Sequence, residues 1–99
     1  MTATLRLGSD DAVYLLVGRR RYLIAPDDLR LLLVQGRAVP VMGEEAVIVG
    51  HAAVNPAGRA VKVFTVSGHF IVPLVSFRRV ATGEARSAPL FPLVPEGRP

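Results

Sequence analysis

Residues 46–72 decide the fold class, and they read AVIVGHAAVNPAGRAVKVFTVSGHFIV. Three runs rich in β-branched and aromatic residues lie in this stretch, at 46–54, 60–66 and 69–72. Residues 55–58, Asn-Pro-Ala-Gly, are typical of a type I turn closed by a left-handed glycine. Residues 67–68, Ser-Gly, are typical of a two-residue hairpin loop. The stretch therefore predicts an antiparallel meander of three strands.

The lengths of these two turns predict which side chains share a face of the meander. A three-residue first loop places Gly50 opposite Phe64, and a two-residue second loop places Phe64 opposite Ile71. In this register both faces are mainly apolar, whereas an antiparallel sheet with one hydrated face alternates apolar and polar residues. The two histidines of the chain, His51 and His69, fall on opposite faces.

Two apolar faces need two covers, because monomeric proteins rarely expose large apolar patches. A barrel interior covers one face, and a single short helix covers only part of the other. We therefore expect the chain to self-associate, most simply as a two-fold homodimer. The residues expected in the oligomer interface are Ile48, Phe64, Val66 and Ile71.

The rest of the chain adds short strands and a helix. Further strands are predicted at 2–7, 12–17, 21–25, 37–42 and 90–94. Pro40 places the fourth of these at a sheet edge, because proline donates no ladder hydrogen bond. A helix is predicted at 27–35, since Pro26 precedes it, two carboxylates lie in its first turn and Gly36 follows it. Residues 73–80 are expected to form a single helical turn.

The predicted fold class is mainly β: a small antiparallel β-barrel or sandwich of six to eight short strands with one short α-helix. A chain of 99 residues is expected to form a single domain, residues 1–94, followed by a flexible tail at 95–99. Hydrophobic residues make up 51% of the chain, which excludes an intrinsically disordered protein. The absence of Cys excludes a disulfide scaffold and a thiolate zinc site.

Targeting signals are not visible in the sequence. The first apolar run, 12–17, follows two aspartates instead of basic residues. The longest uncharged stretch, 63–77, is shorter than the ~20 residues of a membrane-spanning helix. We therefore expect a cytoplasmic protein without membrane contact.

The sequence does not predict catalysis. Phosphate-binding glycine loops, a GxSxG nucleophile elbow and an HExxH motif are all absent from it. His51 and His69 lack nearby carboxylates and are more typical of core or interface histidines than of metal ligands. No nucleophile, base and orienting group can be named together, so no catalytic residue, metal or cofactor is predicted. An active site assembled across a subunit interface is the alternative that one sequence does not display.

The charge of the chain points to an anionic partner. Its net charge is +4, and eleven of its twelve basic residues are Arg. The residues expected to contact nucleic acid are Arg19, Arg20, Arg21, Arg59, Lys62, Arg78 and Arg79. The densest cluster, residues 19–21, falls on a predicted hairpin tip, where guanidinium groups reach phosphates. Tyr14, Tyr22, Phe64 and Phe70 are the aromatic residues available for stacking.

Two functions remain open from the sequence. The first is a non-catalytic, self-associating module that contacts nucleic acid through arginine-rich hairpin tips. The alternative is a protein–protein assembly or adaptor module that acts through an apolar sheet face, without nucleic acid. In that interpretation the arginines only solvate the tip and prevent edge pairing, and the basic excess serves solubility.

Overall fold

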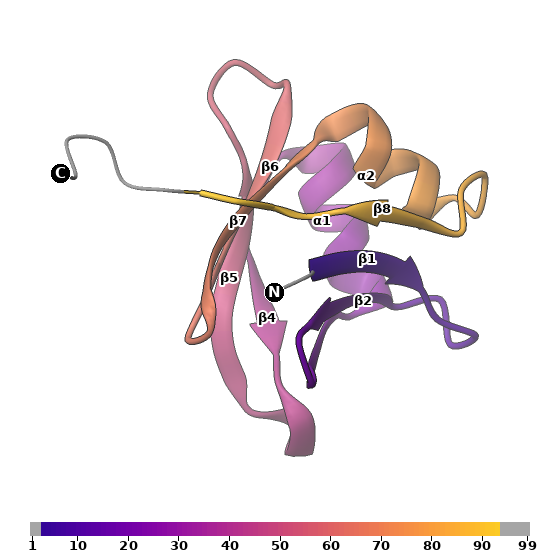
Figure 1. Cartoon of the computed structure of the whole chain (residues 1–99). Helices are drawn as coiled ribbons and strands as arrows, with labels where there is room; N and C mark the ends of the chain where they lie inside the picture. Colours follow the sequence, from indigo (N-terminus) through magenta and orange to yellow (C-terminus); the bar gives the residue numbers. More distant parts are fainter. Residues whose placement is uncertain (1–2, 94–99) are drawn as a thin grey trace, which may run out of the picture.

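The structure, a computed structural model, describes residues 3–93, and over this range nine strands form one antiparallel sheet that curls into a nearly closed barrel (Figure 1). The strands are β1 (Ala3–Leu7), β2 (Val13–Val17), β3 (Arg20–Ile24), β4 (Val39–Met42), β5 (Ile48–Val54), β6 (Ala60–Thr65), β7 (Gly68–Pro73), β8 (Ser87–Pro89) and β9 (Phe91–Pro92). The helices are α1 (Pro26–Gln35) and α2 (Leu74–Ala81). The predicted fold class is confirmed, with nine strands instead of six to eight and one helix more than expected. The predicted tail at 95–99 and the predicted strand ends at 2 and 94 lie outside the described residues.

The segment after α2 closes the barrel. The sheet order is β8-β1-β2-β3-β4-β5-β6-β7-β9, so β8 pairs with the first strand and β9 pairs with the seventh. Leu90, between β8 and β9, donates its N–H to the carbonyl of Ala3 at 2.9 Å. Leu93, just after β9, donates its N–H to the carbonyl of His69 at 2.8 Å. This segment, yellow in Figure 1, runs across the barrel and joins its two ends. Residues 87–89 form a strand that was not among those predicted from the sequence.

The seam between β3 and β4 is the most weakly paired part of the sheet. Only Leu23 and Met42 are partners across it. The prediction that β4 is an edge strand is therefore wrong, because β4 lies between β3 and β5. Pro40 pairs with His51 of β5 on one side and has no partner in β3 on the other. Because the single pair between β3 and β4 is at Met42, the missing N–H of Pro40 leaves no hydrogen bond between these two strands unmade.

The two helices complete the core. Helix α1 contacts β4 and β5, and α2 contacts β1, β6, β7 and β8 (Figure 1). The predicted helix at 27–35 is confirmed, with Pro26 in its first turn and Gly36 ending it at a φ of 67°. Helix α2 spans eight residues instead of one turn, because Phe77 and Val80 both point into the core and are fully buried. The largest fully buried side chains are Phe77, Leu5, Leu15, Ile24 and Leu32.

The predicted register between β5 and β6 is wrong by one residue. Val54 lies opposite Val61, not Ala60. The loop is longer than expected because the side chain of Asn55 accepts hydrogen bonds from the N–H groups of Arg59 at 2.9 Å and Ala60 at 3.2 Å. This arrangement holds Arg59 in the loop, so every side chain of β5 changes face relative to β6.

The second turn is also displaced from its predicted position. Thr65 lies opposite Gly68, so the two loop residues are Val66 and Ser67. The hydroxyl of Thr65 donates to the carbonyl of Gly68 and accepts from the N–H of Ser67, which closes the turn one residue early. The shift across this hairpin is two residues, so Phe64 pairs with His69 instead of Ile71 without a change of face.

The corrected register gives the meander one buried face, not two. The inner face carries fully or nearly fully buried side chains, namely Ala52, Val61, Val63, Phe70 and Val72. The outer face, turned away from the core, carries His51, Lys62, Phe64, His69 and Ile71. The prediction that the two histidines lie on opposite faces is therefore wrong, and the outer face mixes apolar with ionisable side chains.

Gly50 lies opposite Thr65, not opposite Phe64. A Cβ atom at this position would lie 2.8 Å from the carbonyl carbon of Phe64 and 2.9 Å from Cα of Thr65, closer than real Cβ atoms come. The glycine is therefore required by the close approach of the β6 backbone, and not by an aromatic ring filling the space above it.

Candidate functional site

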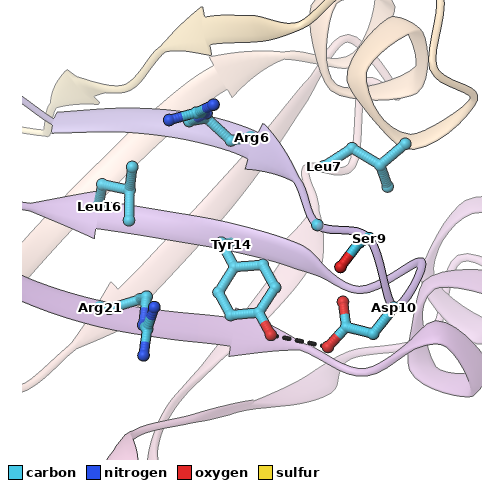
Figure 2. A pocket seen from close by; sticks show the side chains of 8 residues that line it. Arg6, Leu7, Ser9, Asp10, Tyr14, Leu16 and Arg21 are labelled. Atoms are coloured by element: carbon cyan, nitrogen blue, oxygen red, sulfur yellow. Dashed lines mark hydrogen bonds between the residues drawn. The ribbon is translucent and has the colours of Figure 1, made fainter.

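Three adjoining surface cavities meet at Arg21. The first, which we call the tyrosine cavity, has a volume of about 380 Å³ and lies over Tyr14 on the outer face of β1–β3 (Figure 2). The second, which we call the tip cavity, has a volume of about 520 Å³ and lies beside the β2–β3 turn. A third cavity of about 270 Å³ is lined by both Tyr14 and Arg21, so it shares lining residues with each of the other two. We call the three adjoining cavities together the groove.

Tyr14 forms the floor of the tyrosine cavity and is held in one orientation. Its phenol O–H donates to a carboxylate oxygen of Asp10 at 2.7 Å (Figure 2). Its ring lies against the backbone of Gly8, where a Cβ atom would come within 2.8 Å of ring carbon Cδ1. Only glycine leaves room for the ring at that position, so the β1–β2 turn and the tyrosine orientation depend on each other.

The turn that carries Asp10 is fixed by its own hydrogen bonds. The N–H of Gly8 donates to the carbonyl of Ala12 at 2.8 Å, and the other carboxylate oxygen of Asp10 accepts from the N–H of Ala12 at 3.2 Å. The hydrogen bond from Tyr14 lowers the pKa of Asp10, and the bond from Ala12 lowers it further. The same contact with Asp10 raises the pKa of Tyr14. At neutral pH the pair is thus an ionised carboxylate and a protonated phenol.

Two arginines flank this floor. Arg6 on β1 lies opposite Tyr14, and Arg21 on β3 lies opposite Leu16, so the two guanidinium groups stand on either side of β2 (Figure 2). The guanidinium carbon of Arg21 is 5.8 Å from the centroid of the Tyr14 ring, within the range of a cation–π interaction. The cavity therefore combines an aromatic and aliphatic floor, two permanent positive charges and one carboxylate.

The tip cavity brings charges of both signs together. Arg19, Arg20 and Arg21 line it with Glu44 and Glu45 from the segment between β4 and β5. Gly18 has a φ of 61° at the first central position of the two-residue β2–β3 turn, the position where a type II′ turn requires a positive φ. The hairpin end is also tied to the β6–β7 turn by a hydrogen bond between the hydroxyl groups of Tyr22 and Ser67. The arginine cluster thus lies on a rigid hairpin end.

The other basic residues predicted to bind nucleic acid lie elsewhere. Arg59 is in the β5–β6 loop, and Lys62 is on the outer face of β6 between Ala53 and Ile71. Arg78 and Arg79 are exposed on α2. Of the seven predicted residues, the structure brings only Arg19, Arg20 and Arg21 together at the groove.

Three of the residues that form the tyrosine cavity were not predicted from the sequence. Gly8, Asp10 and Arg6 were not predicted to take part, and Tyr14 was only noted as available for stacking. Polar and apolar residues alternate along 3–7 and 13–17, and a short turn joins the two segments. This pattern predicts a hairpin in which Arg6 lies beside Tyr14. No sequence pattern predicts that the ring of Tyr14 lies against Gly8.

The four predicted interface residues lie on or beside the outer face of the β5–β7 meander. Ile48 and Val66 are 64% and 75% exposed, and Phe64 and Ile71 are half-buried. Phe64 lies between two histidines, and the rings of His51 and His69 each lie 4.9 Å from its centroid. The His51 ring is stacked on Phe64 with an interplanar angle of 28°, whereas the His69 ring meets it in an edge arrangement at 75°.

Within residues 3–93, no three His, Cys, Asp or Glu side chains come together to form a metal-binding group. No helix in the described part of the chain is long and apolar enough to cross a membrane. No protein-family model, curated protein or solved structure matches this chain.

Proposed function

We propose that this protein is a non-catalytic module that binds single-stranded nucleic acid along the groove on β1–β3. The observation that carries the proposal is the outer face of the sheet at Tyr14, where a half-buried aromatic ring lies between Arg6 and Arg21. Aromatic rings stack with bases of any sequence, and guanidinium groups bind phosphates in a bidentate manner. A net charge of +4 favours the same class of partner.

The geometry favours a single strand over a duplex. Arg6 and Arg21 are two strands apart and are offset by two residues along β2, which corresponds to roughly 12 Å between their Cα atoms. This spacing leaves room for one base on the floor of Tyr14 and Leu16 while the phosphates on either side approach the two arginines. The faces of bases in a duplex are covered by their neighbours, so a duplex gains nothing from the tyrosine ring.

The charges that line the tip cavity favour one path for the nucleic-acid backbone. Glu44 and Glu45 line the side of that cavity opposite β3, and carboxylates repel phosphates. The phosphates therefore follow the arginines of the β2–β3 turn, Arg19 and Arg20, and stay away from the β4–β5 segment.

Salt dependence of binding tests the proposal. Fluorescence anisotropy with a labelled single-stranded oligothymidylate is measured over a series of salt concentrations. The wild-type affinity is expected to fall steeply with salt. Replacing Arg6 and Arg21 with alanine is expected to reduce the slope of log K against log salt by about 1.4, at ~0.7 for each lost phosphate contact.

A matched pair of substitutions controls for net charge. Arg30 and Arg37 are exposed at α1 and just after it, away from the groove, so their double replacement with alanine removes the same charge. This control is expected to keep the wild-type slope. An equal slope in the two double variants, or wild-type protein that binds no strand at low salt, refutes the proposed function.

Assembly of identical chains through the outer face of the meander is the second candidate function. It is favoured by the exposed apolar side chains Ile48, Val66 and Phe91, which are 64%, 75% and 50% exposed. Light scattering after size exclusion is expected to show a mass above 10.6 kDa for the wild type and a lower mass for Phe64→Asp. Val75→Asp, at an exposed apolar position on α2, is the control and keeps the wild-type mass. A wild-type monomer at micromolar concentration rules this function out.

A further inference from the structure

Asp10 is the one anion that lines the tyrosine cavity, and the other charged residues that line it, Arg6 and Arg21, are positive. A groove built only for phosphates gains nothing from a carboxylate beside its aromatic floor, because the carboxylate repels the strand it binds. The turn hydrogen bond to Ala12 uses one oxygen of Asp10, and the phenol of Tyr14 uses the other. Each carboxylate oxygen has a second acceptor position, so the exposed side chain keeps two positions for a ligand.

The free acceptor positions of Asp10 lie near the edge of a base that stacks on Tyr14. The carboxylate of Asp10 is 2.7 Å from the phenol oxygen of Tyr14, so it lies beyond the hydroxyl end of the ring and to one side of its long axis (Figure 2). A base that stacks on the ring projects its hydrogen-bonding edge beyond the ring in some direction. A base edge directed past the phenol oxygen toward Asp10 meets an acceptor-only group that the turn holds in place.

Guanine is the base whose edge matches this group. Its N1–H and N2–H donors are adjacent, and two adjacent donors fit the two oxygens of one carboxylate. Adenine and cytosine place an acceptor nitrogen beside their amino group, and thymine and uracil place carbonyl oxygens on both sides of N3–H. Each of these bases therefore presents a lone pair to the carboxylate. Arg21, beside the same ring, adds donors of the kind that bind guanine O6 and N7.

The geometry points to a guanine-selective subsite formed by Asp10 and Tyr14 within the bound single strand. Tyr14 supplies the stacking surface, and Asp10 accepts from the Watson–Crick edge of the base. This inference rests on the proposed function, because it assigns a base preference to the same groove. The preference is expected to be about fivefold, near the lower limit for a bidentate contact, because both partners stay exposed to water.

The test uses a labelled oligothymidylate in which one central thymine is replaced by guanine, inosine, adenine or cytosine. Inosine lacks the N2 amino group and keeps N1–H. Anisotropy titrations with the full chain are expected to give affinities in the order guanine, inosine, then the other bases. Equal affinities for all the strands overturn the inference and leave the proposed function standing, whereas no binding of any strand refutes both.

Asp10→Asn separates selectivity from general binding. An amide offers one donor and one acceptor, so this variant is expected to lose the preference for guanine while its affinity for the thymine strand rises. Asp11→Asn is the matched control, because the neighbouring residue loses the same charge and its φ of 69° is one that asparagine adopts readily. The control is expected to keep the fivefold preference. Retention of the preference in Asp10→Asn overturns the inference.

Tyr14→Phe gives an independent readout. The ring remains for stacking, but the hydrogen bond that positions Asp10 is removed. The variant is expected to bind the thymine strand with nearly wild-type affinity and to show a smaller preference for guanine. An undiminished guanine preference in Tyr14→Phe contradicts the role assigned to the phenol.

Discussion

Replacing Gly50 with alanine tests the register of the barrel. Gly50 is in the interior of the sheet, paired with Val41 on one side and Thr65 on the other. The added methyl group would lie 2.8 Å from the carbonyl carbon of Phe64 and 2.9 Å from Cα of Thr65. Backbone atoms cannot avoid it by changing rotamer, so β5 and β6 must separate locally. We expect the free energy of unfolding to fall by about 3 kcal/mol, the upper part of the range for overpacked sites.

Urea unfolding followed by circular dichroism measures this loss, with an unchanged slope and a lower midpoint as the expected signature. Gly36→Ala is the matched control. Gly36 has a φ of 67° and no atom within 4 Å of the added Cβ, so only backbone strain of about 1 kcal/mol opposes alanine there. If Gly50→Ala costs no more than Gly36→Ala, the close approach of β6 at Gly50, and with it the register, is refuted.

Three further substitutions probe the core, the hairpin end and the cavity. Phe77→Ala removes a fully buried ring and is expected to lower the free energy of unfolding by about 3–5 kcal/mol in the same urea assay; a loss below 1 kcal/mol would contradict its place in the core. Tyr22→Phe removes the hydrogen bond from β3 to the β6–β7 turn and is expected to cost about 1 kcal/mol, whereas unchanged stability would show that the bond contributes nothing. Asp10→Asn is expected to lower the pKa of Tyr14 toward its ordinary value of 10.0 in an absorbance titration, because the phenolate no longer forms beside a carboxylate; an unchanged titration would contradict the pairing.

The pair of Asp10 and Tyr14 makes the stability of the fold depend on pH, in directions that follow from the two pKa shifts. The pKa of Asp10 is lowered in the folded protein, so its contribution to stability is present above its ordinary pKa of 3.8 and is lost as the pH falls through the lowered value. The pKa of Tyr14 is raised, so its contribution is present below 10.0 and is lost as the pH rises through the raised value.

Most elements of the fold could be predicted from the sequence because their signals are local. Alternation and β-branched residues mark β2, β5 and β6, and Pro26 and Gly36 mark the ends of α1. Residues 87–89 carry no such signal, because they are few, include a proline and become a strand only through pairing with β1. The one-residue error between β5 and β6 arose because the side chain of Asn55, and not the turn sequence alone, sets the loop length.

The candidate site was predicted in part. The cluster at 19–21 was placed on a hairpin tip, and Arg19 does lie in the β2–β3 turn, whereas Arg20 and Arg21 are the first residues of β3. The basic residues on α2 and β6 were grouped with it only by charge, and charge does not determine where side chains meet. The tyrosine cavity was missed because it depends on a ring that crosses from β2 to the end of β1, where Gly8 leaves space for it.

By itself, the sequence determined most of the extended segments, where the first helix begins and ends, and that the chain is basic. These properties depend on each residue and its near neighbours. Only the tertiary structure decided the register of the meander, the closure of the barrel by residues 87–93 and the gathering of Arg6, Tyr14 and Arg21 around one groove. Each of these depends on pairing between strands, and a shift of one residue in a pairing turns every side chain of a strand from the core to the surface.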